Sequence, residues 1–208
     1  MAKKEHYSTR FEPGKFYHVY NRTVDRKPMF TLDKNYTFFL QRADFYLSPV
    51  LEVYAWCLMN NHFHLLIRIL ESLTFEKSTT LEINPPIDDP HKIVSHSFGK
   101  LFQSYAMAFN KQEGRIGSLF QNPFKRALVD NDTYFTNMVY YIHSNPQTHG
   151  FVDDFRTYPW SSYGRIIDPK PSKLKKEEVL DWFGGKDKYI DFHNLNHKLP
   201  KLNLFFDD

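Results

Sequence analysis

The sequence contains little cysteine, no long apolar run and almost no excess of charge of either sign. The single cysteine, Cys57, excludes an internal disulfide framework within these 208 residues and is typical of a reducing compartment. Cys57 stands in an apolar run, so we expect a buried and inert thiol. No stretch of about 18 apolar residues occurs, and the first residues lack the apolar segment of a signal peptide. A cytoplasmic protein with no membrane partner is therefore predicted.

The charge and the aromatic content permit nucleic-acid binding without requiring it. The formal net charge is only +3, from 27 lysines and arginines against 24 aspartates and glutamates. Such a weak basic balance is compatible with nucleic acid but does not demand it. Aromatic residues make up 17% of the chain, which suits either a large core or a surface that stacks on bases.

The hydrophobic pattern predicts an α+β fold. We expect the following elements, in this order: a strand over 16–22, a helix over 33–47, strands over 50–58 and 62–69 joined by a turn, a helix over 91–112, a strand or irregular hairpin within 117–129, and a helix that ends at Asn145. Asp33 is the expected cap of the first helix, and Asp130 or Asp132 that of the last, which Pro146 should stop. The β-α-β-β-α-β order is that of a ferredoxin-like antiparallel sheet, here with added helices.

Three segments differ in composition from the rest of the chain. Residues 1–14 are polar and end at Pro-Gly, which indicates a leader. Residues 70–90 are rich in proline and acidic residues and read as a loop insert. The charged tail contains one amphipathic stretch at 177–183, which is followed by two glycines that can end a helix.

The motif His62-Phe63-His64 places two imidazoles on one face of a predicted strand, since side chains at i and i+2 point the same way. Imidazole is the commonest metal-ligand side chain, so the pair can act as a two-ligand metal clamp. A third ligand must then come from elsewhere. The alternative is that both histidines are ordinary hydrogen-bonded residues of a strand.

Tyr141 and Asn145 lie four residues apart and therefore on one face of the last predicted helix. Asn145 can be the third metal ligand and Tyr141 an oxygen nucleophile. The alternative is that Tyr141 belongs to the core and Asn145 only ends the helix. Tyr140 points in another direction and provides a natural control.

These residues together suit attack on a phosphodiester. Such a reaction needs an oxygen nucleophile and neutralisation of the charge on the phosphoryl oxygens. Because Mg²⁺ prefers oxygen ligands whereas Mn²⁺ also accepts histidine, a site with two histidines predicts activity with Mg²⁺ or Mn²⁺. No other cofactor is expected.

A basic stretch could contact phosphates. Residues 100–126 include five basic residues and one acidic residue, Glu113, so the net charge of the stretch is five minus one, or +4. With aromatic neighbours such as Phe120, this stretch could track a DNA backbone; an ordinary solvated helix face is the alternative. The candidate nucleic-acid contacts are Arg22, Lys100, Lys111, Arg115, Lys125 and Arg126.

Five segments in this order resemble the single-tyrosine HUH transposases, and among them the REP-associated tyrosine transposases. They are Tyr17-His18-Val19-Tyr20-Asn21-Arg22, Met59-Asn60-Asn61-His62-Phe63-His64-Leu65-Leu66, Gly117-Ser118-Leu119-Phe120-Gln121, Tyr141-Ile142-His143-Ser144-Asn145-Pro146 and Tyr158-Pro159-Trp160-Ser161-Ser162-Tyr163. The resemblance implies a catalytic domain over about 15–165 and leaves 166–208 as an extension of unknown role.

The resemblance also implies residue roles and a partner. His62, His64 and Asn145 would hold Mg²⁺ or Mn²⁺, and Tyr141 would attack single-stranded DNA beside a hairpin. The products would be a 5′-phosphotyrosine and a free 3′-OH, followed by rejoining of strands. Relatives of this type are monomers or homodimers, and the sequence does not choose between them.

Two other functions stay open from the residues alone. A non-catalytic ferredoxin-like protein that binds single-stranded nucleic acid would tolerate loss of the Tyr141 hydroxyl. A metal-dependent hydrolase would cleave DNA without a covalent protein–DNA species. A binding protein needs neither the histidine pair nor the tyrosine, and a hydrolase does not need the tyrosine, so the combination favours the transposase.

Overall fold

The computed structural model describes residues 9–73 and 89–196. The first eight residues of the predicted leader, residues 74–88 of the predicted insert and residues 197–208 of the extension lie outside the described residues.

A four-stranded antiparallel sheet forms the centre of the fold. Its strands are β1 (Phe16–Arg22), β2 (Leu51–Leu58), β3 (His62–Ile69) and β4 (Lys125–Val129). They lie in the order β2-β3-β1-β4, and each neighbouring pair is antiparallel. The predicted ferredoxin-like α+β fold is therefore confirmed, and β1 and β3 are its two central strands.

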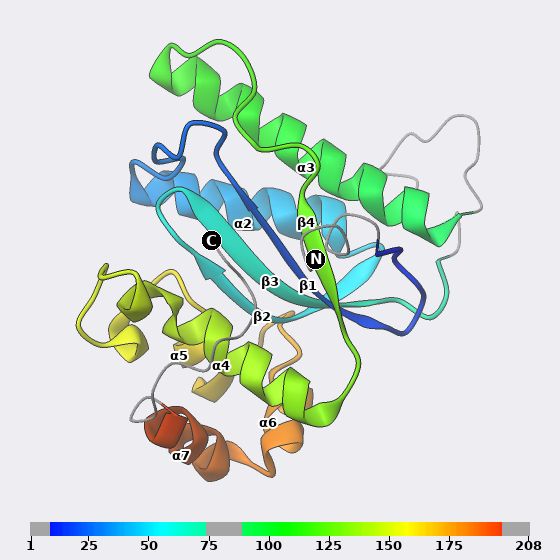
Figure 1. The fold of residues 1–208 in the computed structure, drawn as a ribbon, viewed down its shortest axis with the longest axis vertical. Helices are drawn as coiled ribbons and strands as arrows, with labels where there is room; N and C mark the ends of the chain where they lie inside the picture. The colour runs from blue at the N-terminus through cyan, green and yellow to red at the C-terminus, as the bar shows by residue number, and fades with distance from the viewer. Residues whose placement is uncertain (1–8, 74–88, 197–208) are drawn as a thin grey trace, which may run out of the picture.

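Two helices, α2 (Asp33–Leu47) and α3 (Pro90–Glu113), cover one face of the sheet (Figure 1). Alternate residues of β3 point into this layer, where Phe63 contacts Phe39 and Phe102. Since aromatic side chains bury a large apolar area, this layer supplies much of the hydrophobic stabilisation of the sheet.

The other face carries α4 and the C-terminal elements (Figure 1). These are α4 (Asp132–Thr148), η3 (Phe155–Thr157), α5 (Tyr163–Ile167), α6 (Lys176–Phe183) and α7 (Lys186–Asn196). The amphipathic stretch predicted at 177–183 forms α6, and Gly184 ends it at φ 78°, a conformation that favours glycine. Val179 and Tyr189 from the extension join the same core as Phe135 of α4. The extension thus packs against the helix that carries Tyr141.

The predicted N-terminal caps of α2 and α4 were wrong. Leu32, not Asp33, is the N-cap of α2, and Asn35 in the first turn accepts a hydrogen bond from the Leu32 backbone N–H. Asn131, not Asp130 or Asp132, caps α4, because its Oδ1 accepts from the backbone N–H of Tyr134 at 2.8 Å. An amide oxygen satisfies the open N–H groups of a first turn as a carboxylate does, so the sequence pattern could not separate these neighbours.

Pro146 lies inside α4 and does not stop it, contrary to the prediction. Proline removes one backbone donor, but the residues that follow still supply theirs. The backbone N–H of His149 donates to the backbone oxygen of Asn145 at 2.9 Å, and the backbone N–H of Phe151 donates to the backbone oxygen of Pro146 at 2.8 Å. Asn145 therefore sits within regular helix, and α4 continues to Thr148, almost one further turn.

Cys57 is fully buried, and burial raises the pKa of its thiol well above the ordinary value. The predicted burial of this thiol is confirmed, and a buried thiol of raised pKa is expected to be inert. Of the helices described, none is both long enough and apolar enough to cross a membrane.

Candidate functional site

The pairing of β1 with β3 gathers three histidines on the sheet face that α4 covers. In this register Tyr20 lies opposite His64, and Arg22 opposite His62. Residues directly opposite in an antiparallel pair share a face, so His18, two positions before Tyr20, lies on this face as well. His18, His62 and His64 are all buried, with exposed fractions of 0, 5 and 0%.

Helix α4 runs over these histidines with one face toward them. The ring of Tyr141 meets His64 edge-on at 5.6 Å between centroids, and it meets His18 at 5.8 Å. Two turns later, His149 meets His62 at 5.5 Å. Asn145 lies four residues from both Tyr141 and His149 and therefore on the same face of α4.

Tyr140 points away from His18, His62 and His64, as predicted. Its ring packs against Phe155, Phe192 and His193 at the back of α4, and burial raises the pKa of its phenol. Two adjacent tyrosines of one helix therefore occupy unlike environments.

Hydrogen bonds engage the Nδ1 atom of both motif histidines. Nδ1 of His62 lies 2.6 Å from Asn61 Oδ1, and Nδ1 of His64 lies 2.9 Å from His18 Nε2. Their Nε2 atoms, on the far side of each ring, are buried. When Nδ1 carries the proton of a neutral imidazole, Nε2 holds the lone pair that can bind a metal.

Asn145 carries a buried side-chain oxygen on the helix face that includes Tyr141. The residue is 1% exposed, and its Nδ2 donates to the backbone oxygen of Tyr141 at 2.8 Å. Its Oδ1 is buried and accepts no hydrogen bond from any residue that the structure describes. A buried acceptor left in this state is costly, which a bound cation would relieve.

The available donors fit a divalent ion with mixed ligands. Two imidazole nitrogens and one amide oxygen leave room for water or phosphate oxygens, which suits Mn²⁺ and, with more oxygens, Mg²⁺. Within 9–73 and 89–196 there is no group of three or more His, Cys, Asp or Glu residues that could hold a metal. An ion at this place would therefore depend on the amide of Asn145.

Two of the six predicted nucleic-acid contacts lie at the site. Arg22 and Lys125 line a small recess together with His62, Tyr20 and Gln121. The ammonium of Lys125 stands 5.3 Å from the centre of the Tyr20 ring. A phosphate next to His62 would meet both positive charges.

The other four lie elsewhere. Arg126 is buried on the opposite face, where its guanidinium packs on Phe11 and Phe124. Arg115 forms an ion pair with Asp25 at 3.2 Å. Lys100 and Lys111 belong to α3, across the sheet from the histidines. The predicted basic stretch therefore does not form one surface, because its residues alternate between strand faces and helix.

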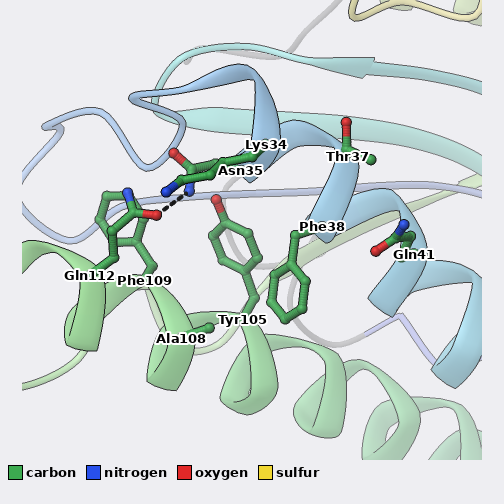
Figure 2. A pocket seen from close by; sticks show the side chains of 9 residues that line it. All are labelled: Lys34, Asn35, Thr37, Phe38, Gln41, Tyr105, Ala108, Phe109 and Gln112. Carbon is green, nitrogen blue, oxygen red and sulfur yellow. Dashed lines mark hydrogen bonds between the residues drawn. The ribbon is translucent and has the colours of Figure 1, made fainter.

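A separate hollow of about 480 Å³ lies between α2 and α3 (Figure 2). Asn35 donates to Gln112 across it at 3.0 Å, and Tyr105 reaches past it to the backbone oxygen of Met29 at 2.6 Å. Its lining is mostly apolar and includes one charged residue, Lys34. It lies on the sheet face away from Tyr141, and no histidine lines it, so it lacks the metal ligands of the candidate site.

Behind the site, a buried polar cluster attaches α4 to the C-terminal extension. In His143 of α4, Nε2 lies 2.8 Å from Ser162 Oγ, and Nδ1 lies 3.1 Å from His193 Nε2. Burial, and then the charge of His193, lowers the pKa of His143 well below its ordinary value; burial lowers the pKa of His193 to about 4. Both rings are neutral at physiological pH and act as hydrogen-bonding core residues.

Sequence reasoning missed His18, Asn61 and His149. His18 and Asn61 stand within the segments that resemble the transposases, but a motif does not state which side chains meet. The signal for His18 was its alternation with Tyr20 and Arg22, which becomes informative only once β1 is paired with β3.

Known proteins resemble this chain in fold and in sequence. No family model matches the chain. A solved REP-associated tyrosine transposase bound to a REP hairpin shares the fold with a TM-score of 0.57 at 18% identity, over 76% of this chain and 82% of the solved one.

A curated protein of Haemophilus influenzae that carries the name of the REP-associated tyrosine transposases is 27% identical over 144 residues, covering 65% of this chain and 69% of the relative. The chain is thus similar in sequence and in fold to REP-associated tyrosine transposases, and the resemblance predicted from its motifs is confirmed.

Proposed function

We propose that this protein is a DNA transposase that cuts and rejoins single-stranded DNA beside a hairpin, with Tyr141 as its nucleophile. The observation that carries the proposal is the contact of the Tyr141 ring with His64, while the equivalent surface of Tyr140 faces the core. The similarity to REP-associated tyrosine transposases supports the same reaction class.

The covalent step exchanges one phosphoester bond for another. The Tyr141 oxygen gives up its proton and bonds to phosphorus; the bond from phosphorus to the 3′ oxygen breaks, and that oxygen leaves as a 3′-OH after taking a proton. The DNA stays attached through a 5′-phosphotyrosine. In the reverse sense a 3′-OH attacks the phosphotyrosine and frees Tyr141, so rejoining needs no ATP.

His62, His64 and Asn145 are the residues that would hold Mg²⁺ or Mn²⁺. When bound, such an ion neutralises charge on the phosphoryl oxygens and favours the phenolate over the phenol, whose ordinary pKa is near 10. The helix holds the Tyr141 ring edge-on to the His64 ring, so the proposed nucleophile would stand beside a proposed metal ligand before DNA binds.

Arg22 and Lys125 are the best-placed residues to hold the DNA backbone, since both line the recess beside His62. Arg126, whose guanidinium is buried, is a poor candidate for such a contact. Contacts from Lys100, Lys111 and Arg115 stay predictions, since these residues lie on other parts of the surface.

One copy of the chain supplies every proposed catalytic group. His62 and His64 both lie on β3, and the ring of His64 meets Tyr141 on α4 of the same chain, so we expect a single protomer to suffice for cleavage of a strand. We propose residues 15–165 as the catalytic domain, with 166–208 as an extension that supports α4. Such an enzyme would act on single-stranded DNA in the cytoplasm.

The test is a cleavage assay on labelled single-stranded DNA that carries the hairpins flanking the gene, in Mn²⁺, Mg²⁺ or chelator. Wild type should give a metal-dependent covalent protein–DNA band on a denaturing gel, and Tyr141→Phe should give none. Tyr140→Phe, which removes the same atom from the neighbouring side chain, is the matched control and should stay active.

Other outcomes separate the alternatives. Cleavage without a covalent band, unchanged in Tyr141→Phe, would indicate a hydrolase. Hairpin binding without cleavage or metal dependence would indicate a binding protein. Loss of the band in Tyr140→Phe rather than Tyr141→Phe would mean that the nucleophile has been misassigned.

A further inference from the structure

We infer that His18 and Asn61 are positioning residues of the proposed metal site: they hold His64 and His62 with Nδ1 protonated, so that both rings present Nε2 to one ion. The inference rests on the proposed function and deepens it, because it assigns roles to two residues outside the histidine motif itself.

The contact between His18 and His64 has the geometry of a strong in-plane hydrogen bond. The two nitrogen atoms are 2.9 Å apart, the ring planes differ by 11°, and the centroids are 5.1 Å apart. Two rings that meet at these values lie edge to edge in nearly one plane. The N–H bond and the lone pair of an imidazole both point in that plane, so the donor faces the acceptor.

The direction of this bond follows from the chemistry of the site. If Nε2 of His64 binds an ion, the ring proton must sit on Nδ1, and His64 is then the donor. His18 Nε2 is the acceptor, and the His18 proton sits on its own Nδ1. Tyr20 lies nearly parallel to both rings, at 11° to His18 and 17° to His64, and limits their rotation.

Asn61 does the same for His62 with an oxygen. Its Oδ1 lies 2.6 Å from His62 Nδ1, while its Nδ2 donates to the backbone oxygen of Arg26 at 2.6 Å. The second bond fixes the amide so that the oxygen, which can only accept, faces His62. The Nδ1 atom of His62 must then carry the proton, and Nε2 its lone pair.

Both histidines are thus oriented by partners of different kinds from different elements. His18 comes from β1, and Asn61 from the turn that precedes β3. Partners of this sort fix ring orientation and raise ligand basicity, and their loss typically weakens metal binding by about 10- to 100-fold.

The first measurement uses the metal-free wild-type protein. Long-range ¹H–¹⁵N spectra of protein labelled with ¹⁵N-histidine distinguish the two neutral tautomers. The Nδ1–H form is expected for His62 and His64, assigned by comparing spectra of the single alanine variants. The Nε2–H form at His64 would overturn the role of His18, and at His62 that of Asn61.

The second measurement is the affinity for Mn²⁺ alone, without DNA. His18→Phe keeps a ring in the stack but removes the acceptor, whereas His18→Gln keeps an acceptor near the position of Nε2 and removes the ring. We expect about 10-fold or greater weakening in His18→Phe and near wild-type affinity in His18→Gln. Asn61→Ala should weaken binding similarly, and Asn61→Asp should restore it.

The possible outcomes distinguish failure of the positioning roles from failure of the proposed transposase function. Equal Mn²⁺ affinity in wild type, His18→Phe and Asn61→Ala overturns the inference even if the Tyr141 adduct forms. Absence of Mn²⁺ binding by the wild type overturns it as well. If Mn²⁺ binds and both substitutions weaken it, but no adduct forms on any hairpin, the transposase proposal fails and the positioning roles stand. Should His18→Phe fail to fold, the wild-type tautomers and His18→Gln still decide.

Discussion

The two faces of the sheet are equally buried but chemically unlike. On the face toward α2 and α3, β3 presents Phe63 among aromatic rings; on the face toward α4 it presents His64 among histidine and tyrosine rings. Both side chains are 0% exposed. Burial alone therefore does not separate a residue that stabilises the fold from one that is proposed to take part in the reaction.

The difference lies in what the buried atoms need. Phe63 is satisfied by contact with other carbon atoms, whereas a buried imidazole must have partners for two ring nitrogens. On the α4 face His18 and Asn61 supply the partner of Nδ1 in His64 and His62, and a bound ion would be the partner of the buried Nε2 atoms. The α2–α3 face can then provide stability while the α4 face holds the polar groups of the proposed site.

The largest effect should come from the α4 face. His64→Ala is expected to abolish metal-dependent cleavage in the gel assay, because it removes a proposed ligand and the edge contact with Tyr141. Hairpin binding, measured by gel shift, should stay largely intact. Equal loss of binding and cleavage would show that His64 is structural and that the contrast between the faces is wrong.

The adjacent residue should behave in the opposite way. Phe63→Ala is expected to lower the free energy of unfolding by about 3–5 kcal/mol through the cavity it leaves. Urea unfolding measures the loss. Cleavage per folded molecule should be preserved, and its disappearance in protein that circular dichroism shows to be folded would mean that the faces are coupled.

Acid should weaken the attachment of α4 to α7. The pKa of His193 is about 4 in the folded protein, against an ordinary 6.5, so the unfolded chain binds more protons between these values. Stability is then full above about pH 6.5 and falls as the pH drops, by about 3 kcal/mol from His193 alone at pH 4. Burial of His143, whose pKa is also lowered, adds a loss of the same sign.

Urea unfolding at pH 7.5 and at pH 4 measures this effect. The double variant His143→Phe/His193→Phe should lose less stability between the two pH values than the wild type does. An identical pH dependence in both proteins would contradict the neutral histidine pair.

The smallest effect should distinguish two lysines. Lys125→Ala is expected to weaken hairpin binding and to reduce the slope of log affinity against log salt by about 1, as for one lost phosphate contact. Lys34→Ala, an exposed lysine of α2 on the far side of the sheet and not a candidate DNA contact, is the control and should leave the slope unchanged. Equal slopes for both variants would remove the recess beside His62 from the binding surface.

Local patterns predicted most of the fold. The strand over 16–22 and the helix over 33–47 were predicted with their observed bounds, because alternation and helical periodicity are local properties. The histidine pair and the contrast between Tyr140 and Tyr141 were predictable for the same reason, since each depends on one strand or one helix.

What the sequence could not provide depended on pairing between distant segments. The bond from His18 to His64 requires the register of β1 against β3, which no local pattern specifies. The division of the basic stretch had the same origin: Lys125 and Arg126 are neighbours in sequence but lie on opposite faces of β4. Pro146 was predicted to end α4 because proline cannot donate a backbone hydrogen bond. The helix tolerates the loss of one such bond near its C-terminal end.

The buried position of Cys57 makes the protein convenient for site-directed labelling. The only thiol of these 208 residues is shielded from solvent, and its raised pKa keeps it from reacting as a thiolate. A second cysteine at an exposed position, such as Ile116→Cys where the native side chain is 98% exposed, would be the sole target of a maleimide dye. Fluorescence from one known position could then follow DNA binding without first removing the native cysteine.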